Sequence, residues 1–236
     1  MDTSIKHLNK NEFTLTFDLD WCKDAELEFV LNKLDEHSIK GALFFVTHKN
    51  LLTESIQSRG HKIGIHPNFS INSTHGNSEE AVLEYFLNNF KDIEFIRTHG
   101  LYFSTKTMVN ILKTIKSIKW DLSNLEPNSP IRFSKFEYAH AKCFRINFNW
   151  EDDQFLYSNP KNFEIKPEYF KIYNFHPTHI FNNTNSMESY LNGQINVSSN
   201  TEQQGIRTYF LNLMQFSQYH LPIEKLISFV DTTLVD

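Results

Sequence analysis

The chain has 236 residues, of which 40% are hydrophobic and 22% are charged, with a formal net charge of −5. This apolar content excludes a disordered chain, and the acidic balance lacks the basic footprint of a nucleic-acid-binding protein. No apolar run approaches the length of a membrane span, so none is expected. The segment Met1–Asn11 is polar and lacks the apolar stretch of a secretory signal, which predicts a cytoplasmic protein.

Strand-like and helix-like segments alternate along the chain, and no linker or repeat divides it. Strands are predicted over 13–17, 41–46, 62–65, 93–96, 143–148 and 171–175. Helices are predicted over 25–34, 51–58, 79–90, 105–115 and, as two helices broken near Pro222, over 205–230. This order predicts a parallel α/β sheet or barrel in a single domain, residues 1–236.

Ionisable residues recur where the predicted strands end. They are Asp18 and Asp20, His66, Arg97 and His99, Glu151 to Asp153, and His176 and His179. The carboxyl ends of parallel strands lie at one face of the sheet, where active sites form. These residues are therefore expected to meet at one site.

Asp18 and Asp20 are two residues apart, so in a continued strand both side chains point to the same face. Two carboxylates that close repel each other unless a cation or a proton separates them. We expect one to bind a metal ion and the other to act as a base, rather than to cap the next helix, a role that suits Asp24 better. His66, fixed by the turn at Pro67, is predicted to be a further metal ligand.

Arg97 and His99 form the next pair. Arg97 could orient the Asp18 carboxylate, and His99 could be a third metal ligand. The alternative is a salt bridge followed by a loop histidine before Gly100. His61 has no comparable support and is expected to be structural or exposed.

The run Trp150-Glu151-Asp152-Asp153 places an aromatic ring beside three acids. This mixture is common in saccharide sites, where rings stack on the sugar and carboxylates bind its hydroxyl groups, so Trp150, Glu151 and Asp152 are candidate substrate-binding residues. A solvated acidic helix start is an equally good interpretation. His176 or His179 could donate a proton to a leaving group, and His179 is also a candidate for substrate binding.

Taken in order, these motifs resemble the polysaccharide deacetylase superfamily, also called the NodB-homology or carbohydrate esterase 4 group. The segment from Thr16 to Asp20 is similar to a spaced variant of its T-F-D-D-G motif, and Gly60 to His66 is similar to its G-H-E-I-G-x-H segment. The best match is a branch of surface-polysaccharide or O-antigen deacetylases with F-D-x-D-W, G-I-H-P-N-F, R-x-H, W-E-D-D and F-H-P-x-H. The resemblance covers residues 13 to about 216.

The resemblance implies a distorted (β/α)7-type barrel that binds one divalent metal ion, expected to be zinc. By position, Asp18 would be the general base, with Arg97 holding it in place. Asp20 and His66 would be metal ligands, and His176 would be the general acid.

One position departs from the family pattern. Ser70 stands where the common H-x-x-x-H motif has a second histidine ligand, which leaves a zinc site of Asp20 and His66 short of ligands. A related branch takes its third ligand from a later strand, and by that analogy we expect His99 to complete the site. The alternatives are His75, Asn68 and His179.

The implied function is metal-dependent removal of an N-acetyl group from a sugar in cell-surface polysaccharide biosynthesis. The expected partner is an acetylated saccharide carried on a nucleotide, a lipid or a glycan. Two alternatives remain open. One is an amidase that acts on a non-sugar amide on the same barrel, and the other is a non-catalytic saccharide-binding relative that has lost the metal.

Overall fold

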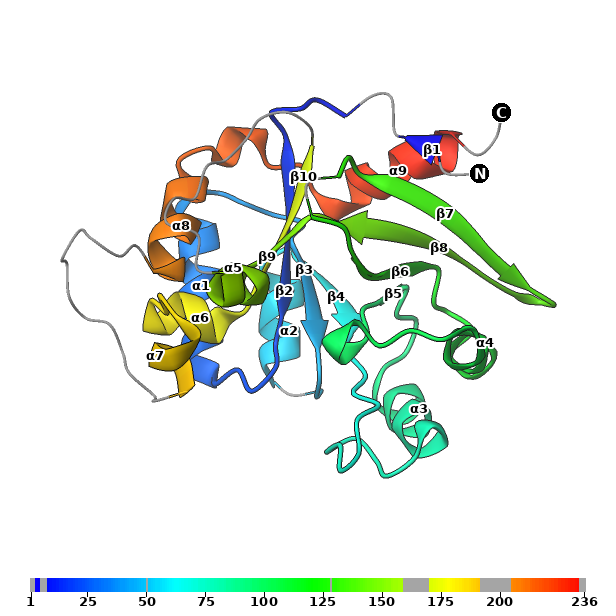
Figure 1. The fold of residues 1–236 in the computed structure, drawn as a ribbon. Helices are drawn as coiled ribbons and strands as arrows, with labels where there is room; N and C mark the ends of the chain where they lie inside the picture. Colours follow the sequence, from blue (N-terminus) through cyan, green and yellow to red (C-terminus); the bar gives the residue numbers. More distant parts are fainter. Residues whose placement is uncertain are drawn as a thin grey trace.

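The computed structural model describes residues 3–4, 8–49, 51–127, 129–158, 170–191 and 205–233. In this part of the chain a ten-stranded sheet has the order β1-β7-β8-β6-β5-β4-β3-β2-β10-β9 (Figure 1). From β8 to β9 in this order all neighbours are parallel, whereas β7 runs antiparallel to β8 and to β1. The strands are β1 (Thr3–Ser4), β2 (Phe13–Asp18), β3 (Leu43–Val46), β4 (Lys62–Ile65), β5 (Phe95–Ile96), β6 (Trp120–Leu125), β7 (Arg132–Tyr138), β8 (Ala141–Phe148), β9 (Trp150–Glu151) and β10 (Lys171–Phe175).

Asn149 links the two ends of the parallel series. It is the residue between β8, which pairs with β6, and β9, which pairs with β10. Its side-chain amide continues the pairing, accepting from the Ile172 amide at 2.9 Å and donating to the Phe170 carbonyl at 3.3 Å. The sheet therefore curls into a half-barrel, and the fold is the predicted distorted (β/α)7-type barrel.

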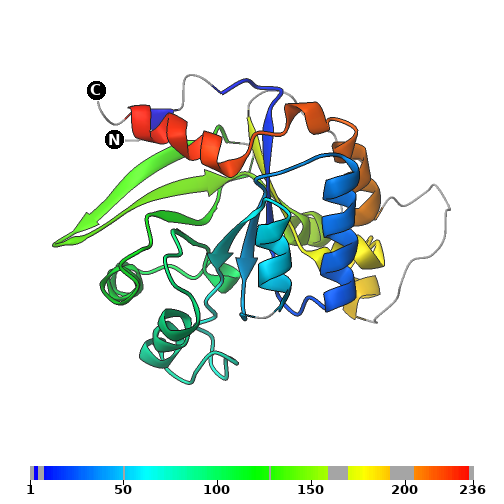
Figure 2. The same ribbon diagram turned by 180° about the vertical axis from the view of Figure 1, so that it is seen from behind.

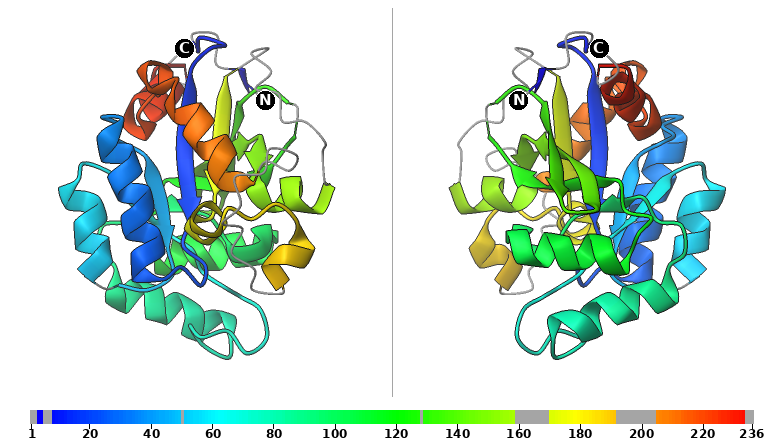
Figure 3. Two further views of the ribbon diagram at one scale, coloured as in Figure 1. Left: turned by 90° about the vertical axis from the view of Figure 1, so that its left-hand side faces the viewer. Right: turned by 90° about the vertical axis from the view of Figure 1, so that its right-hand side faces the viewer.

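Helices cover the outer face of this sheet, except the last one, whose apolar residues belong to the inner core (Figures 1 and 2). They are α1 (Asp24–Glu36), α2 (Leu51–Ser58), α3 (Glu79–Asn89), α4 (Thr105–Thr114), α5 (Asp152–Ser158), α6 (Pro177–Asn182), α7 (Met187–Leu191), α8 (Ile206–Met214) and α9 (Ile223–Thr233). The last helix, α9, lies where the strands begin: the Leu221 amide just before it donates to the Phe13 carbonyl at 2.7 Å (Figure 3). Within the described ranges, none of the helices has the length and apolar character needed to cross a membrane.

Consecutive residues of β3 show the two faces of the sheet. Phe44 lies in the outer core beneath the helices, stacked on Phe17 with ring centroids 4.6 Å apart. Phe45 belongs to a second, inner core that includes Phe148 and Leu226 of α9. Because side chains alternate along a strand, strands buried on both faces need almost continuous apolar sequence. This is the pattern that identified most of them.

The strands β6 and β7 and the helices α6 and α7 were not predicted. In β6, W-D-L-S-N-L, polar residues interrupt the apolar pattern, although Asp121 in it is fully buried. In β7 most side chains are partly or fully exposed. The start of α1 also differs: Lys23 holds the cap position and its amide donates to Glu26 Oε2 at 3.0 Å, so Asp24 is not the cap.

His61, which precedes β4, is a buried structural residue. Its ring packs edge-on against Phe44 with centroids 5.4 Å apart, and neither ring nitrogen has a hydrogen-bond partner. Burial, with the Lys40 charge adding to it, lowers the pKa of His61 from 6.5 to about 4. The unfolded chain therefore binds a proton more readily than the folded chain between these two values. The stability that the neutral ring contributes is complete above pH 6.5 and is lost as the pH falls toward 4.

We expect this one residue to lower the free energy of unfolding by about 2 kcal/mol between pH 7 and pH 5. The variant His61→Phe keeps an aromatic ring but cannot titrate, so its stability should fall less over the same range. Urea unfolding of both proteins at the two pH values measures the difference. The same pH dependence in both proteins would contradict a neutral, buried His61.

Candidate active site

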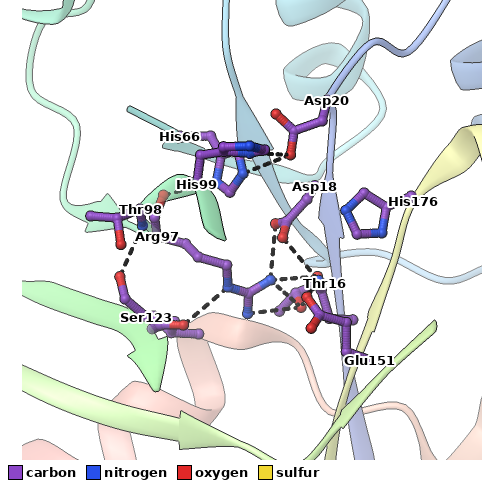
Figure 4. A network of polar contacts seen from close by, with 12 residues as sticks. Thr16, Asp18, Asp20, His66, Arg97, Thr98, His99, Ser123, Glu151 and His176 are labelled. Atoms are coloured by element: carbon purple, nitrogen blue, oxygen red, sulfur yellow. Dashed lines mark hydrogen bonds and ion pairs between the residues drawn. The ribbon is translucent and has the colours of Figure 1, made fainter. Parts of the chain in front are cut away.

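Asp20, His66 and His99 converge beyond the carboxyl ends of β2, β4 and β5 (Figure 4). Asp20 Oδ2 lies 2.8 Å from His66 Nε2 and 3.0 Å from His99 Nδ1. One ligand atom from each residue lies within 4.8 Å of the other two. Burial opposes ionisation of Asp20, but the two histidines hold the pKa of its carboxyl far below the usual range. The structure thus brings together the three residues that the sequence nominated as metal ligands.

The hydrogen bonds of His66 show that this group suits a cation. Its Nδ1 lies 2.8 Å from the Arg97 carbonyl oxygen, which can only accept, so Nδ1 carries a proton. A neutral His66 then turns the lone pair of Nε2 toward the Asp20 carboxylate, which also only accepts. The contact is favourable only with a proton or a metal ion between the two atoms. Two imidazoles and one carboxylate, with a fourth position open, fit a divalent metal ion of the catalytic zinc type.

The Asp18 carboxylate, at the end of β2, is held from two sides. Arg97 Nη1 donates to Oδ1 at 2.9 Å, and Asn174 Nδ2 donates to Oδ2 at 2.9 Å. Arg97 also donates to Asn174 Oδ1 and, at 3.1 Å, to Thr16 Oγ1. These bonds tie together β2, β10 and the segment after β5, so Asp18 has one fixed orientation.

Arg97 is itself immobilised. Its side chain is fully buried, and the guanidinium lies between the rings of Phe45 and Phe148, 4.4 Å and 4.2 Å from their centroids. Its Nε donates to the Leu122 carbonyl at 3.0 Å. A buried guanidinium is stable only with such partners. The predicted pairing of Arg97 with Asp18 is present. The remaining donors of Arg97 bind neighbouring strands and so hold the guanidinium in place.

His176, directly after β10, is clamped by Asp152. Asp152 Oδ2 accepts from the His176 backbone amide at 2.7 Å, and Asp152 Oδ1 lies 2.7 Å from His176 Nδ1, which leaves Nε2 for other contacts. Burial disfavours the charged ring, but the Asp152 carboxylate, helped by Asp153 and Asp18, raises the pKa of His176 well above its ordinary value. In the view of Figure 4, Asp18 lies between His176 and the pair of His66 and His99.

Glu151 shares a hydrogen-bond donor with Asp18. Asn174 Nδ2 donates to Glu151 Oε1 at 3.2 Å as well as to Asp18. Burial raises the pKa of Glu151 to about 7, and the Asp18 charge acts in the same direction. Near neutral pH this carboxyl is therefore part protonated, so it can both donate and accept a hydrogen bond.

A cavity of about 680 Å³ lies over this site. Its walls include Asp18, Asp20, His66, His99, Glu151 and His176. Two aromatic side chains also line it and are largely exposed: Trp21 is 72% exposed and Tyr157 is 74% exposed. The Trp21 ring meets His99 edge-on with centroids 5.5 Å apart. The cavity thus combines an acidic and imidazole-rich floor with open aromatic surfaces.

Trp150 and Asp152, predicted to bind substrate, are not among the lining residues. Trp150 packs against Phe175 and Tyr173, with ring centroids 4.9 Å and 5.8 Å away, because alternation along β9 turns Glu151 to the cavity and Trp150 to the core. Asp152 is fully buried beneath His176. The acidic run does begin a helix, α5, as the alternative interpretation expected. The first acid of that helix, Asp152, is however buried rather than solvated.

The alternative third ligands lie elsewhere. Asn68 Oδ1 accepts from the Ser70 amide at 2.8 Å, and the Asn68 amide donates to His75 Nδ1 at 3.2 Å. The His75 ring stacks on Tyr85 with centroids 5.2 Å apart. Among the described residues, His99 is the one histidine of the three candidate histidines that shares a possible metal group with Asp20 and His66.

His179 forms a second group. Its Nε2 lies 2.8 Å from Asp153 Oδ1, and its Nδ1 lies 3.2 Å from Thr184 Oγ1. With His176, these residues make another set of three whose ligand atoms lie within 4.8 Å of one another.

Sequence reasoning missed Asn174, Thr16 and Trp21. Asn174 and Thr16 are polar residues inside otherwise apolar strands, and both are fully buried. A buried polar residue needs a partner, and this was the available signal. The partner itself, a guanidinium from another strand, could not be identified without the sheet order.

A parallel α/β barrel with acids and histidines clustered at the carboxyl ends of its strands has the architecture of a barrel enzyme with a candidate metal centre. The chain belongs to the WbmS-like polysaccharide deacetylase family, whose model matches residues 15–194. This confirms the resemblance found in the sequence.

In three dimensions the chain is similar to the crystal structure of a Bordetella bronchiseptica protein, WbmS, described as a candidate polysaccharide deacetylase involved in O-antigen biosynthesis. The TM-score is 0.72 at 22% sequence identity, over 87% of this chain and 90% of that one. At this identity the likeness shows the shared fold. No curated protein matches the chain.

Proposed function

We propose that the chain hydrolyses the acetamide of an N-acetylated sugar used in cell-surface polysaccharide biosynthesis, releasing acetate and an amino sugar. One observation carries the proposal: Asp18, oriented by Arg97 and Asn174, lies in the same cavity as the Asp20–His66–His99 group. Family membership supports deacetylation. The O-antigen description of the similar structure supports a surface glycan as the destination of the product.

Each group then has a chemical role. A divalent metal ion held by Asp20, His66 and His99, with zinc as the candidate, would polarise the amide carbonyl and acidify a water molecule. Asp18 would take the proton of the attacking water, and Arg97 holds its carboxylate in position. His176 would donate a proton to the nitrogen that leaves as an amine.

The substrate is proposed to be an acetylated saccharide linked to a nucleotide, a lipid or a glycan. Trp21 and Tyr157 offer exposed rings on which sugar faces can stack. Glu151 and His179 line the cavity and can bind hydroxyl groups. This arrangement supports a sugar over a non-sugar amide.

The first test is metal content together with acetate release. We expect chelator-treated protein given one equivalent of zinc to retain about one ion per chain and to release acetate from N-acetylated sugars. His99→Ala should lose the tight binding of that ion and the acetate release, because it leaves two ligands. Elemental mass spectrometry and an acetate assay measure the two. Wild type that takes up no zinc would contradict the proposal and favour a saccharide-binding protein. Metal held by His99→Ala as tightly as by wild type would remove His99 as an essential ligand.

The role of His176 predicts a pH effect. Because Asp152 raises the pKa of His176, the proton donor stays protonated to higher pH than an ordinary histidine, and kcat should fall only as the pH passes that raised pKa. The variant Asp152→Asn removes the charge, so the alkaline limb should move to lower pH. Profiles of kcat against pH for both proteins measure the shift. An unchanged alkaline limb would show that His176 is not the acid.

A further inference from the structure

A second possible metal group lies in the same cavity, separate from Asp20, His66 and His99. It consists of Asp153 in the first turn of α5, His176 after β10, and His179 in α6. The ligand atoms of the three lie within 4.8 Å of one another. All three line the cavity, so an ion in solution can reach them.

Both histidines have one ring nitrogen engaged by an outer residue. Asp152, fully buried, accepts from Nδ1 of His176 at 2.7 Å. Thr184, also buried, contacts Nδ1 of His179 at 3.2 Å. In each ring Nε2 is left for the inner contact, and for His179 that contact is Asp153 Oδ1 at 2.8 Å. Metal-binding histidines are typically oriented in this way, with a carboxylate or another oxygen on the far nitrogen.

We propose that Asp153, His176 and His179 form a second divalent-metal site, which fills at higher metal concentration than the first. Two imidazoles and one carboxylate are again the donor set of catalytic zinc sites. The site should be the weaker one because the Asp153 side chain is 41% exposed, whereas that of Asp20 is 8% exposed. An exposed carboxylate is less well held in place before the ion arrives.

Occupancy of this site would inhibit the reaction, an inference that rests on the proposed function. The lone pair of His176 Nε2 can bind either a proton or a metal ion. A bound ion releases that proton to solvent, so His176 can no longer donate it to the leaving amine. Excess zinc should therefore oppose the activity that the first equivalent supports.

The binding test uses cobalt(II) alone, added to chelator-treated protein and followed by absorbance and by elemental analysis. Wild type is expected to bind two equivalents in two phases. Asp153→Ala should bind one, with the tight phase intact, and His179→Gln should behave in the same way. Asp24→Asn removes an exposed acid outside both groups and should still bind two. A single equivalent in wild type, or a second one that survives in both variants, would overturn the second site.

The activity test separates the two proposals. Acetate release should rise as the first zinc equivalent is added and then fall by tenfold or more as the second site fills. Asp153→Ala should resist this fall at the same zinc concentration. Equal inhibition of the two proteins would overturn the regulatory role. Two bound equivalents with no acetate released at any zinc concentration would contradict the proposed function but would still support the second metal site.

Discussion

Asp18→Asn is expected to lower the rate of acetate release by about 10²–10⁴-fold while one metal ion stays bound. The amide cannot accept the proton of the attacking water, whereas the ligand set of Asp20, His66 and His99 is untouched. The Arg97 guanidinium loses its charged partner, but it keeps its bonds to Thr16 and to the Leu122 carbonyl. Acetate release and metal content should be measured on the same preparation, with circular dichroism to verify folding.

Asp24→Asn is the matched control, because it removes an exposed acid from the first turn of α1. It should retain both the rate and the metal. Two results for Asp18→Asn would contradict the assignment. Loss of the metal would make Asp18 a ligand, and a rate near that of wild type would place the base elsewhere.

Arg97→Met is expected to be the most destabilising single change at the site, costing about 3–5 kcal/mol of unfolding free energy. Methionine fits between Phe45 and Phe148, so lost packing is small. The cost comes from leaving the buried Asp18 carboxylate without its cation. Urea unfolding measures the change.

Arg59→Met is the control. Arg59 pairs with Glu28 and, at 2.9 Å, with Asp35, but these are surface pairs, so its loss should cost about 1 kcal/mol or less. The double variant Arg97→Met with Asp18→Asn should be less destabilised than the sum of the two single variants, because no unpaired charge remains. Additive effects, or an Arg97→Met cost no larger than that of Arg59→Met, would show that the pair is not what holds this part of the barrel.

One rule allowed the sequence to predict which residues gather at the candidate site. Polar residues at the ends of parallel strands meet, and this rule predicted that Asp20, His66 and His99 lie at one site although 79 residues separate the first from the last. The choice of Asp20 and His99 as ligands came from the family resemblance. The rule says which end of a strand a residue occupies. It does not say which way the side chain points once the strand has ended.

The sequence did not show the direction in which each of these side chains points. Trp150 and Glu151 are neighbours in the same acidic and aromatic run, yet the pleat of β9 sends one to the core and the other to the cavity. The role of Asn174 could not be predicted for a related reason. Its partners Asp18 and Arg97 become its neighbours only when β10 pairs with β2 in the folded sheet. Strand β6 was missed because its polar residues are satisfied by distant groups, as Asp121 is by Arg145 at 2.7 Å.

The pairing of β10 with β2 also bears on how the chain folds. Thr16 and Asn174, which lie side by side in this pairing, are 158 residues apart in the sequence. During synthesis β2 to β6 emerge long before β10, so Arg97 is made well ahead of one of its main partners. Contacts of such long range slow folding because the intervening loop must close first. We expect a slow step in which β10 docks. Until then the nascent barrel exposes the edge of β2 that β10 later covers.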